Sequence, residues 1–134
     1  MNNIVAKIIK EDRLLGNLAQ EAEECYSEDK NMAALACLFI LVEQAIKFGL
    51  EKTEGNFADL IKEAKENGIL SQIEFDMLND LRKIRNGLFH ETHYSWILEE
   101  DGVASFFSEN ETKEKIYALF STRCFEIVLK MLSL

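Results

Sequence analysis

The residues best suited to chemistry lie together in the segment LRKIRNGLFHE, which spans residues 81–91. Arg85, Asn86 and His90 all occur there. Arginine stays protonated and binds anions through paired N–H donors, whereas histidine titrates near neutral pH and can accept or donate a proton. These side-chain types suit acid–base chemistry on an anionic group. The competing interpretation is a polar helix end, where a histidine interacts with the last backbone carbonyls.

Helical geometry gives Arg85 an unusual position. With about 100° of rotation per residue, one arc of a helix over residues 71–89 collects the side chains that should face a core. These are Ile73, Met77, Leu78, Leu81, Ile84 and Leu88. Arg85 falls in the same arc, where a guanidinium needs a charged partner or a solvated cleft. His90 lies about 140° away on an ideal helix. A bend or helix end at Gly87, or a second subunit on a two-fold axis, would bring the two together.

The segment resembles the defining motif of the HEPN domains, α-helical bundles that carry an arginine, four to six residues and a histidine. A polar residue often follows the arginine directly. Here four residues separate Arg85 from His90, and Asn86 is the polar residue that directly follows the arginine. The upstream segment FILVEQAIKFGLEK, residues 39–52, resembles the second helix of such domains. The resemblance covers residues 1–134 in helix order and about 33–91 in close residue pattern.

The resemblance implies metal-independent RNA cleavage of a toxin or defence type, with no cofactor. The ribose 2′-hydroxyl attacks the adjacent phosphate and leaves a cyclic phosphate and a 5′-hydroxyl. His90 would act as general base or acid, and Arg85 would hold the phosphate and stabilise its developing charge. Asn86 would orient the histidine or donate to a phosphate oxygen.

The resemblance also implies partners. We expect a homodimer, an RNA substrate, and an antitoxin or a nucleotidyltransferase as a protein partner. Family members paired with such an antitoxin often have a tyrosine two residues after the histidine, where this chain has Thr92. Tyr94 lies two residues further, beside His93. Other members are non-catalytic modules for dimerisation or for binding a partner or regulator, and this is the alternative hypothesis.

Glu43 is a candidate supporting residue. It is the first polar residue after the apolar run AALACLFILV, residues 33–42, and would meet Arg85 as an ion pair. The alternative is an exposed pair with Lys47, one helical turn away. His93 is interpreted as a solvated loop residue, because a metal site built on His90 and His93 lacks a third ligand. No metal site is therefore expected.

Composition predicts one all-α domain over residues 1–134. Among 134 residues there is no proline and only six glycines, while helix-forming residues are plentiful. Apolar spacing predicts a bundle of four to five helices. The expected segments are residues 3 to about 26, 33–50, 56–67, 71–89, and from Ser108 or Asn110 to the end. The apolar run of residues 33–42 predicts the central helix of the bundle, and the last segment carries an apolar stripe that includes Leu119. Asn56 is expected to cap the third segment and Gly68 to end it, and Ser71 and Glu74 form a capping-box pattern at the start of the fourth.

The stretch from Glu91 to Phe107 has no helical period. Asp101-Gly102 there is typical of a two-residue β-hairpin turn. Two structures are compatible with this stretch. One is a small β-hairpin between the motif helix and the last helix, and the other is an irregular loop. In the hairpin, one face would carry Tyr94, Trp96, Leu98, Val103 and Phe107.

Charge and cysteine content narrow the class of protein. The formal net charge of −9 argues against DNA and against general nucleic-acid binding, because phosphate binding depends on Lys and Arg. A small local basic site remains compatible with this net charge. Three cysteines without ligand spacing are expected as reduced thiols in or near the core. No leader and no membrane-spanning segment are expected, so the prediction is a soluble cytoplasmic protein.

Overall fold

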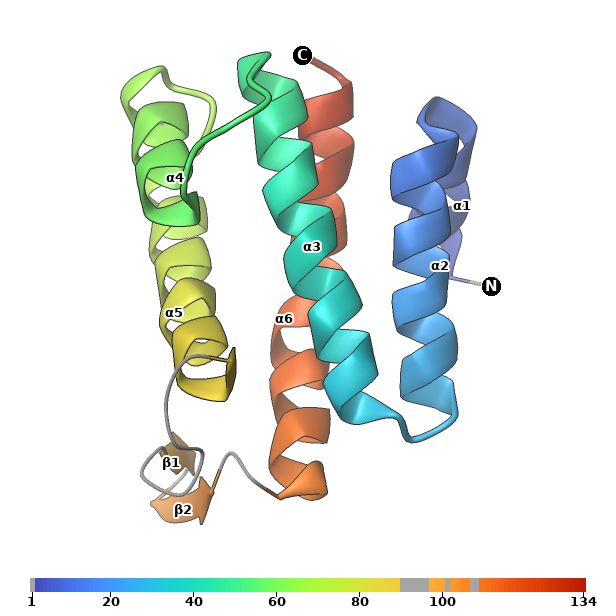
Figure 1. Ribbon diagram of the computed structural model, residues 1–134, viewed down its shortest axis with the longest axis vertical. Coiled ribbons are helices and arrows are strands. Elements are labelled where there is room, and N and C mark those ends of the chain that lie inside the picture. The colour runs from blue at the N-terminus through green and yellow to red at the C-terminus, as the bar shows by residue number, and fades with distance from the viewer. Residues whose placement is uncertain (1, 90–96, 101, 107–108) are drawn as a thin grey trace.

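The computed structural model of the chain describes residues 2–89, 97–100, 102–106 and 109–134. These ranges form an all-α bundle with one small pair of strands (Figure 1). The elements are α1 (Asn3–Glu11), α2 (Arg13–Ser27), α3 (Asn31–Leu50), α4 (Phe57–Glu66), α5 (Gln72–Phe89), β1 (Ile97–Glu100), β2 (Val103–Phe106) and α6 (Asn110–Leu132). Six helices occur in these ranges, where the sequence predicts four to five.

α3 forms the centre of the bundle, as its uniformly apolar sequence predicts. It packs against α2 on one side and α4 on the other, with α6 behind it (Figure 1). Its buried residues are Asn31, Ala34, Leu35, Leu38, Phe39, Leu41, Val42, Ala45 and Ile46. A helix enclosed by neighbours derives most of its stability from this burial rather than from intrinsic propensity.

The expectation that no segment reaches membrane-spanning length is wrong for α3. Within the part of the chain that the structure describes, α3 alone has the length and apolar composition to cross a bilayer. The core helix of a globular bundle meets the same criteria, and α3 has that position between α2, α4 and α6. Its apolar character is therefore accounted for by packing within the bundle.

Asp12 divides the segment predicted as one helix from residue 3 to about 26. Its backbone is extended (φ −151°, ψ 115°); its N–H donates to the Ile8 carbonyl, and its side chain accepts from the Leu15 N–H. One residue thus ends α1 and caps α2. Gly16 permits the close approach that follows, because a Cβ there would lie 2.4 Å from the Cα of Ile9. The apolar period is helical on both sides of Asp12, so spacing alone misses the break.

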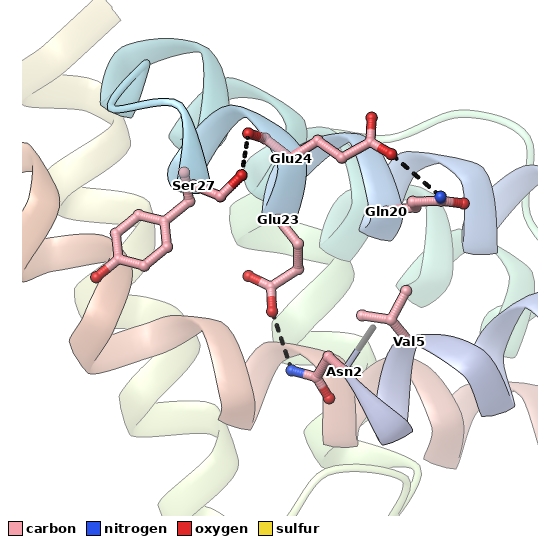
Figure 2. A pocket seen from close by; sticks show the side chains of 7 residues that line it. Asn2, Val5, Gln20, Glu23, Glu24 and Ser27 are labelled. Carbon is pink, nitrogen blue, oxygen red and sulfur yellow. Dashed lines mark hydrogen bonds between the residues drawn. The ribbon is translucent and has the colours of Figure 1, made fainter.

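Glu23 joins three helices near the start of the chain. Asn2 Nδ2 donates to one carboxylate oxygen at 3.0 Å, and the Tyr117 hydroxyl donates to the other at 2.6 Å. Figure 2 shows Asn2 and Glu23 facing each other at the edge of an open pocket between the start of α1 and α2. The Tyr117 ring also stacks on Tyr26, with centroids 4.4 Å apart. Glu23 therefore ties α2 both to the N-terminal cap and to α6.

The ends of α4 follow the predicted residue chemistry. Asn56 caps the helix, because its Oδ1 accepts from the Asp59 N–H at 2.9 Å. Gly68 stands just beyond the C-terminal end with φ 74°, a conformation that glycine adopts without strain. The turn into α5 is therefore specified by local sequence.

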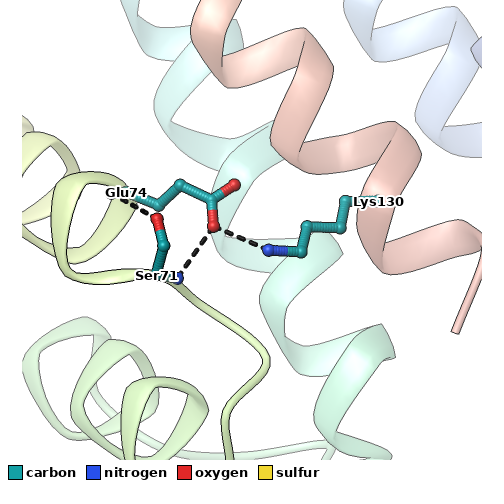
Figure 3. A network of polar contacts seen from close by, with 3 residues as sticks. All are labelled: Ser71, Glu74 and Lys130. Atoms are coloured by element: carbon teal, nitrogen blue, oxygen red, sulfur yellow. Dashed lines mark hydrogen bonds and ion pairs between the residues drawn. The ribbon is translucent and has the colours of Figure 1, made fainter.

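α5 begins with the predicted capping box. The Glu74 N–H donates to Ser71 Oγ at 3.1 Å, and Glu74 Oε1 accepts from the Ser71 N–H at 2.8 Å. Lys130 of α6 donates to the same Glu74 oxygen at 2.7 Å (Figure 3). Burial raises the pKa of Glu74, but the hydrogen bonds from Lys130 and Ser71 outweigh burial and leave the pKa below its ordinary value. This carboxylate thus fixes the first turn of α5 against α6.

Two apolar residues predicted to face the core are exposed instead. On α5, Met77, Leu78, Leu81 and Leu88 are buried and Ile84 is half-buried, whereas Ile73 is 74% exposed. On α6, Leu119 is 50% exposed, although it belongs to the predicted apolar stripe. Ile73 and Leu119 both line grooves between α5 and α6. The stripe therefore extends beyond the bundle's own core on these two helices.

A pair of short strands lies between α5 and α6 in the chain. β1 and β2 pair in antiparallel register, with Ile97 opposite Phe106 and Glu100 opposite Val103. The connection passes through Gly102, which has φ 79°. The predicted apolar face stays a prediction, because Tyr94, Trp96 and Phe107 lie outside the described residues.

Candidate functional site

Arg85 lies on the side of α5 that faces α3. Its Nη2 is 3.4 Å from Oε2 of Glu43, and 27% of the arginine side chain and 19% of the glutamate side chain are exposed. The pair is therefore neither enclosed in the core nor free in solvent. An arginine in a core-facing arc needs such a compensating charge.

Glu43 is shared between two cations. Lys47 Nζ lies 3.8 Å from Oε1 of Glu43, while Arg85 is near Oε2. The sequence leaves Arg85 and Lys47 open as alternative partners of Glu43, and both contacts occur. Both distances exceed the roughly 2.7–2.9 Å of short charge-assisted hydrogen bonds. The cluster of Arg85, Glu43 and Lys47 thus has two cations, one carboxylate and ion-pair distances longer than those of short hydrogen bonds.

An apolar recess supports the Arg85 side chain. The Arg85 Cζ lies 5.9 Å from the centroid of the Phe57 ring, within the range of a cation–π contact. Phe39, Val42 and Leu81 line the same small recess, together with Arg82. Contacts from α3 and α4 therefore restrict where the guanidinium can lie. Sequence reasoning missed Phe57, whose one local signal is its place directly after the Asn56 cap.

α5 does not end at Gly87. The helix continues through Gly87 to Phe89, and Gly87 itself is buried. The helix end suggested at Gly87 is therefore wrong, and Asn86 is a half-buried residue within a continuous helix. The predicted residues His90, His93 and Tyr94 lie outside the described residues, so the approach of His90 to Arg85 stays a prediction.

Other candidate chemistry is sparse in the part of the chain that the structure describes. There, no group of three or more His, Cys, Asp or Glu side chains is arranged to hold a metal ion. Glu23 and Tyr117 form the tightest contact between side chains far apart in sequence, and sequence reasoning missed it. Burial and the hydrogen bond to Glu23 raise the pKa of Tyr117 far above its usual range. A tyrosine held protonated in this way is a structural hydrogen-bond donor.

No known protein family, curated protein or solved structure matches the chain.

Proposed function

We propose that the chain is a HEPN-like domain that cleaves RNA without a metal ion, with Arg85, Asn86 and His90 as catalytic residues. The observation that carries the proposal is the placement of Arg85. Its guanidinium keeps access to solvent, while Glu43 and Phe57 restrict its position. A permanently protonated donor held in place is suited to stabilise the charge that develops on a reacting phosphate.

The proposed reaction is an internal transfer within the RNA chain. The 2′-oxygen of one ribose bonds to the adjacent phosphorus, and the bond from that phosphorus to the next nucleotide's 5′-oxygen breaks. His90 accepts the proton of the 2′-hydroxyl. The leaving 5′-oxygen takes a proton from water or from the partner subunit's His90. Arg85 donates to the non-bridging oxygens. The products are a 2′,3′-cyclic phosphate and a 5′-hydroxyl.

Local charge supports an anionic substrate at this face. Arg82 and Arg85 lie about 60° apart around α5, and Lys47 shares Glu43 with Arg85. The whole chain carries −9, so long-range attraction for RNA is absent. Binding would then depend on this local group of cations and should weaken steeply with salt.

The Glu43 contact also favours a second candidate function. The Glu43 carboxylate already forms an ion pair with the Arg85 guanidinium, so a phosphate would have to compete with Glu43 for Arg85. In this alternative the ion pair is structural, and the domain is a non-catalytic module that dimerises or binds a nucleotidyltransferase or a regulator. Truncating one partner would then mainly destabilise the fold.

We expect the protein to act in the cytoplasm. Cys25, Cys37 and Cys124 are free thiols in the structure, and none forms a disulfide. Free thiols are typical of proteins kept in a reducing compartment, where RNA substrates also occur.

The test is cleavage of labelled RNA by the purified chain in the presence of a metal chelator. His90→Ala and Arg85→Ala should abolish cleavage, whereas Arg13→Ala, at an exposed arginine of α2, should retain most of it. The ends of the products are then identified chemically. Cyclic phosphate and 5′-hydroxyl ends, lost in both catalytic variants, would support the nuclease. Circular dichroism of each variant checks that the fold is kept.

Two results would contradict the proposal. One is cleavage that persists in His90→Ala, which would point to a contaminating ribonuclease. The other is intact RNA of every class tested, together with stable capture of a purified nucleotidyltransferase or regulator. That second result would establish the binding module instead.

A further inference from the structure

Two thiols of the chain meet across the helical hairpin of α2 and α3. Cys25 lies near the end of α2 and Cys37 lies about two turns into α3. Their side chains are hydrogen-bonded to each other. The two helices pack side by side and are joined by a short turn over residues 28–30 (Figure 1). The hairpin itself therefore holds the two sulfurs together.

The paired cysteines differ from the third one in burial. Cys25 and Cys37 are each half-buried at the edge of the core, one helical turn beyond the fully buried Ala22 and Ala34. Cys124 of α6 is fully enclosed, and burial raises its pKa far above the usual range of a thiol. Cys124 thus behaves as a small core side chain, whereas the other two form a pair that a small oxidant can reach.

We propose that Cys25 and Cys37 are a site of reversible oxidation, at which a hydroperoxide converts the two thiols into a disulfide that links α2 to α3. Sulfurs in hydrogen-bond contact need only small side-chain rotations to reach the S–S bond length of about 2.05 Å. Disulfides that form in a reducing compartment are usually transient and redox-sensing, so such a bond is compatible with a cytoplasmic protein.

The oxidation proceeds in two balanced steps, written here for hydrogen peroxide. The thiolate of one cysteine bonds to a peroxide oxygen and the O–O bond breaks. The released hydroxide takes up a proton to form water, and the oxidised sulfur is left as a sulfenic acid. The second thiol then bonds to the sulfenic sulfur, the S–O bond breaks, and its proton leaves with the hydroxide as a second water. Two thiols and one peroxide thus give one disulfide and two waters.

The surroundings of Cys37 assign the order of the two steps. Burial, the negative charge of Glu21 and the contacts with Cys25 raise the pKa of Cys37. A thiol that keeps its proton is a poor nucleophile toward peroxide. Cys25 is therefore the sulfur that is oxidised first, and Cys37 is the sulfur that resolves the sulfenic acid.

The disulfide would stiffen a part of the bundle that already joins several helices. Cys25 lies two residues after Glu23, whose carboxylate accepts from Asn2 and from Tyr117 of α6. A bond from Cys25 to Cys37 would add α3 to this junction. It would also restrict the unfolded chain, so the oxidised protein should melt about 5 °C or more above the reduced protein.

The experiment treats the reduced full chain with hydrogen peroxide, removes the peroxide with catalase and alkylates the remaining thiols in denaturant. Mass spectrometry of the intact chain should show that two of the three cysteines no longer react and that no oxygen has been gained. Peptide mapping without reductant should join the Cys25 peptide to the Cys37 peptide. Dithiothreitol should restore all three alkylation sites and the lower melting temperature.

Single substitutions separate the pair from the third thiol. Cys25→Ser and Cys37→Ser should each abolish the disulfide within the chain and the rise in melting temperature. A sulfenic acid should be trapped by dimedone at Cys25 in Cys37→Ser, and much less trapping should occur at Cys37 in Cys25→Ser. Cys124→Ala is the matched control and should form the disulfide as the wild type does. Circular dichroism shows whether each variant remains folded.

Three results with the wild-type chain would overturn the inference. The first is a chain that keeps all three reactive thiols at a peroxide concentration that oxidises free cysteine. The second is oxidation to sulfinic acid without a link between α2 and α3. The third is a disulfide that includes Cys124 or that joins two chains in preference to Cys25 and Cys37. None of these results bears on RNA cleavage by Arg85 and His90, because neither residue takes part in the thiol chemistry.

Discussion

Glu23 and Glu43 are carboxylates on neighbouring helices, each with two partners, and their contacts differ in kind. Glu23 accepts from the neutral donors of Asn2 and Tyr117 at 3.0 and 2.6 Å. Glu43 lies between the cations of Arg85 and Lys47 at 3.4 and 3.8 Å. The first is a tight hydrogen-bonded junction of three helices, and the second is a looser group of charges.

The difference indicates different roles for the two glutamates. Neutral donors at short distance occupy both carboxylate oxygens of Glu23 and hold them in a fixed position. At Glu43, two cations share one carboxylate, so positive charge is left over and the guanidinium can still meet another anion. We therefore assign Glu23 to stability and Glu43 to the positioning of Arg85 within the proposed site.

The largest expected effect comes from removing the cation at Glu43. Arg85→Ala should lower RNA cleavage by about a hundredfold or more, because the donor that stabilises the developing phosphate charge is lost. Its free energy of unfolding should change by no more than about 1 kcal/mol, since the ion pair is partly exposed. Single-turnover cleavage and urea denaturation measure the two quantities. A collapse of stability with unchanged cleavage would make Arg85 a structural residue like Tyr117.

The next effect comes from removing a donor at Glu23. Tyr117→Phe should lower the free energy of unfolding by about 2 kcal/mol, because a partly buried hydrogen bond to a carboxylate is lost. RNA cleavage per folded molecule should stay unchanged. Tyr26→Phe is the matched control, as its ring stacks on Tyr117 but its hydroxyl makes no hydrogen bond in the described ranges. Equal losses in both variants would show that the contact with Glu23 contributes no stability beyond that of removing any hydroxyl at this pair of rings.

A smaller effect should follow from neutralising Glu43 itself. Glu43→Gln should reduce the cleavage rate by about threefold to tenfold through a lower kcat, because Arg85 loses the charge that positions it. Glu43→Asp should retain more activity than Glu43→Gln. A rise in cleavage in Glu43→Gln would mean that Glu43 competes with the phosphate rather than supporting Arg85.

The smallest effect concerns alkaline pH. Because the pKa of Tyr117 is raised in the folded state, its contact stabilises the fold fully below the ordinary value of 10.0 and is lost as pH rises above it. The expected loss is less than about 1 kcal/mol within half a pH unit above that value. Urea denaturation at several pH values should show this loss in the wild type and not in Tyr117→Phe. Identical slopes for both proteins would argue against a protonated Tyr117 as the donor to Glu23.

Local chemistry made much of the fold predictable. The apolar run of α3 indicated the central helix, and the Ser71–Glu74 capping box and Gly68 marked the ends of α5 and α4. Each of these signals lies within a few residues of the feature that it specifies. The inward position of Arg85 also followed from periodicity, and Glu43 was one of two partners that the sequence left open.

Contacts between residues far apart in the chain could not be predicted. Tyr117 and Glu23 are 94 residues apart, and Lys130 and Glu74 are 56 apart, so nothing in local sequence links them. The exposure of Ile73 and Leu119 also escaped prediction, because periodicity places residues on an arc but does not show how far a neighbouring helix covers that arc. Both residues line a groove between α5 and α6.

The single residue between α1 and α2 decides the shape of the first fifth of the chain. Asp12 interrupts helical hydrogen bonding for one position, and the absence of a side chain at Gly16 lets α1 and α2 pack closely against each other. Without that interruption, residues 3–27 would extend as one rod, and Val5 and Ile8, now buried, would project into water. The break at Asp12 thus turns the chain between α1 and α2, so that the apolar side chains of α1 pack into the core of the bundle.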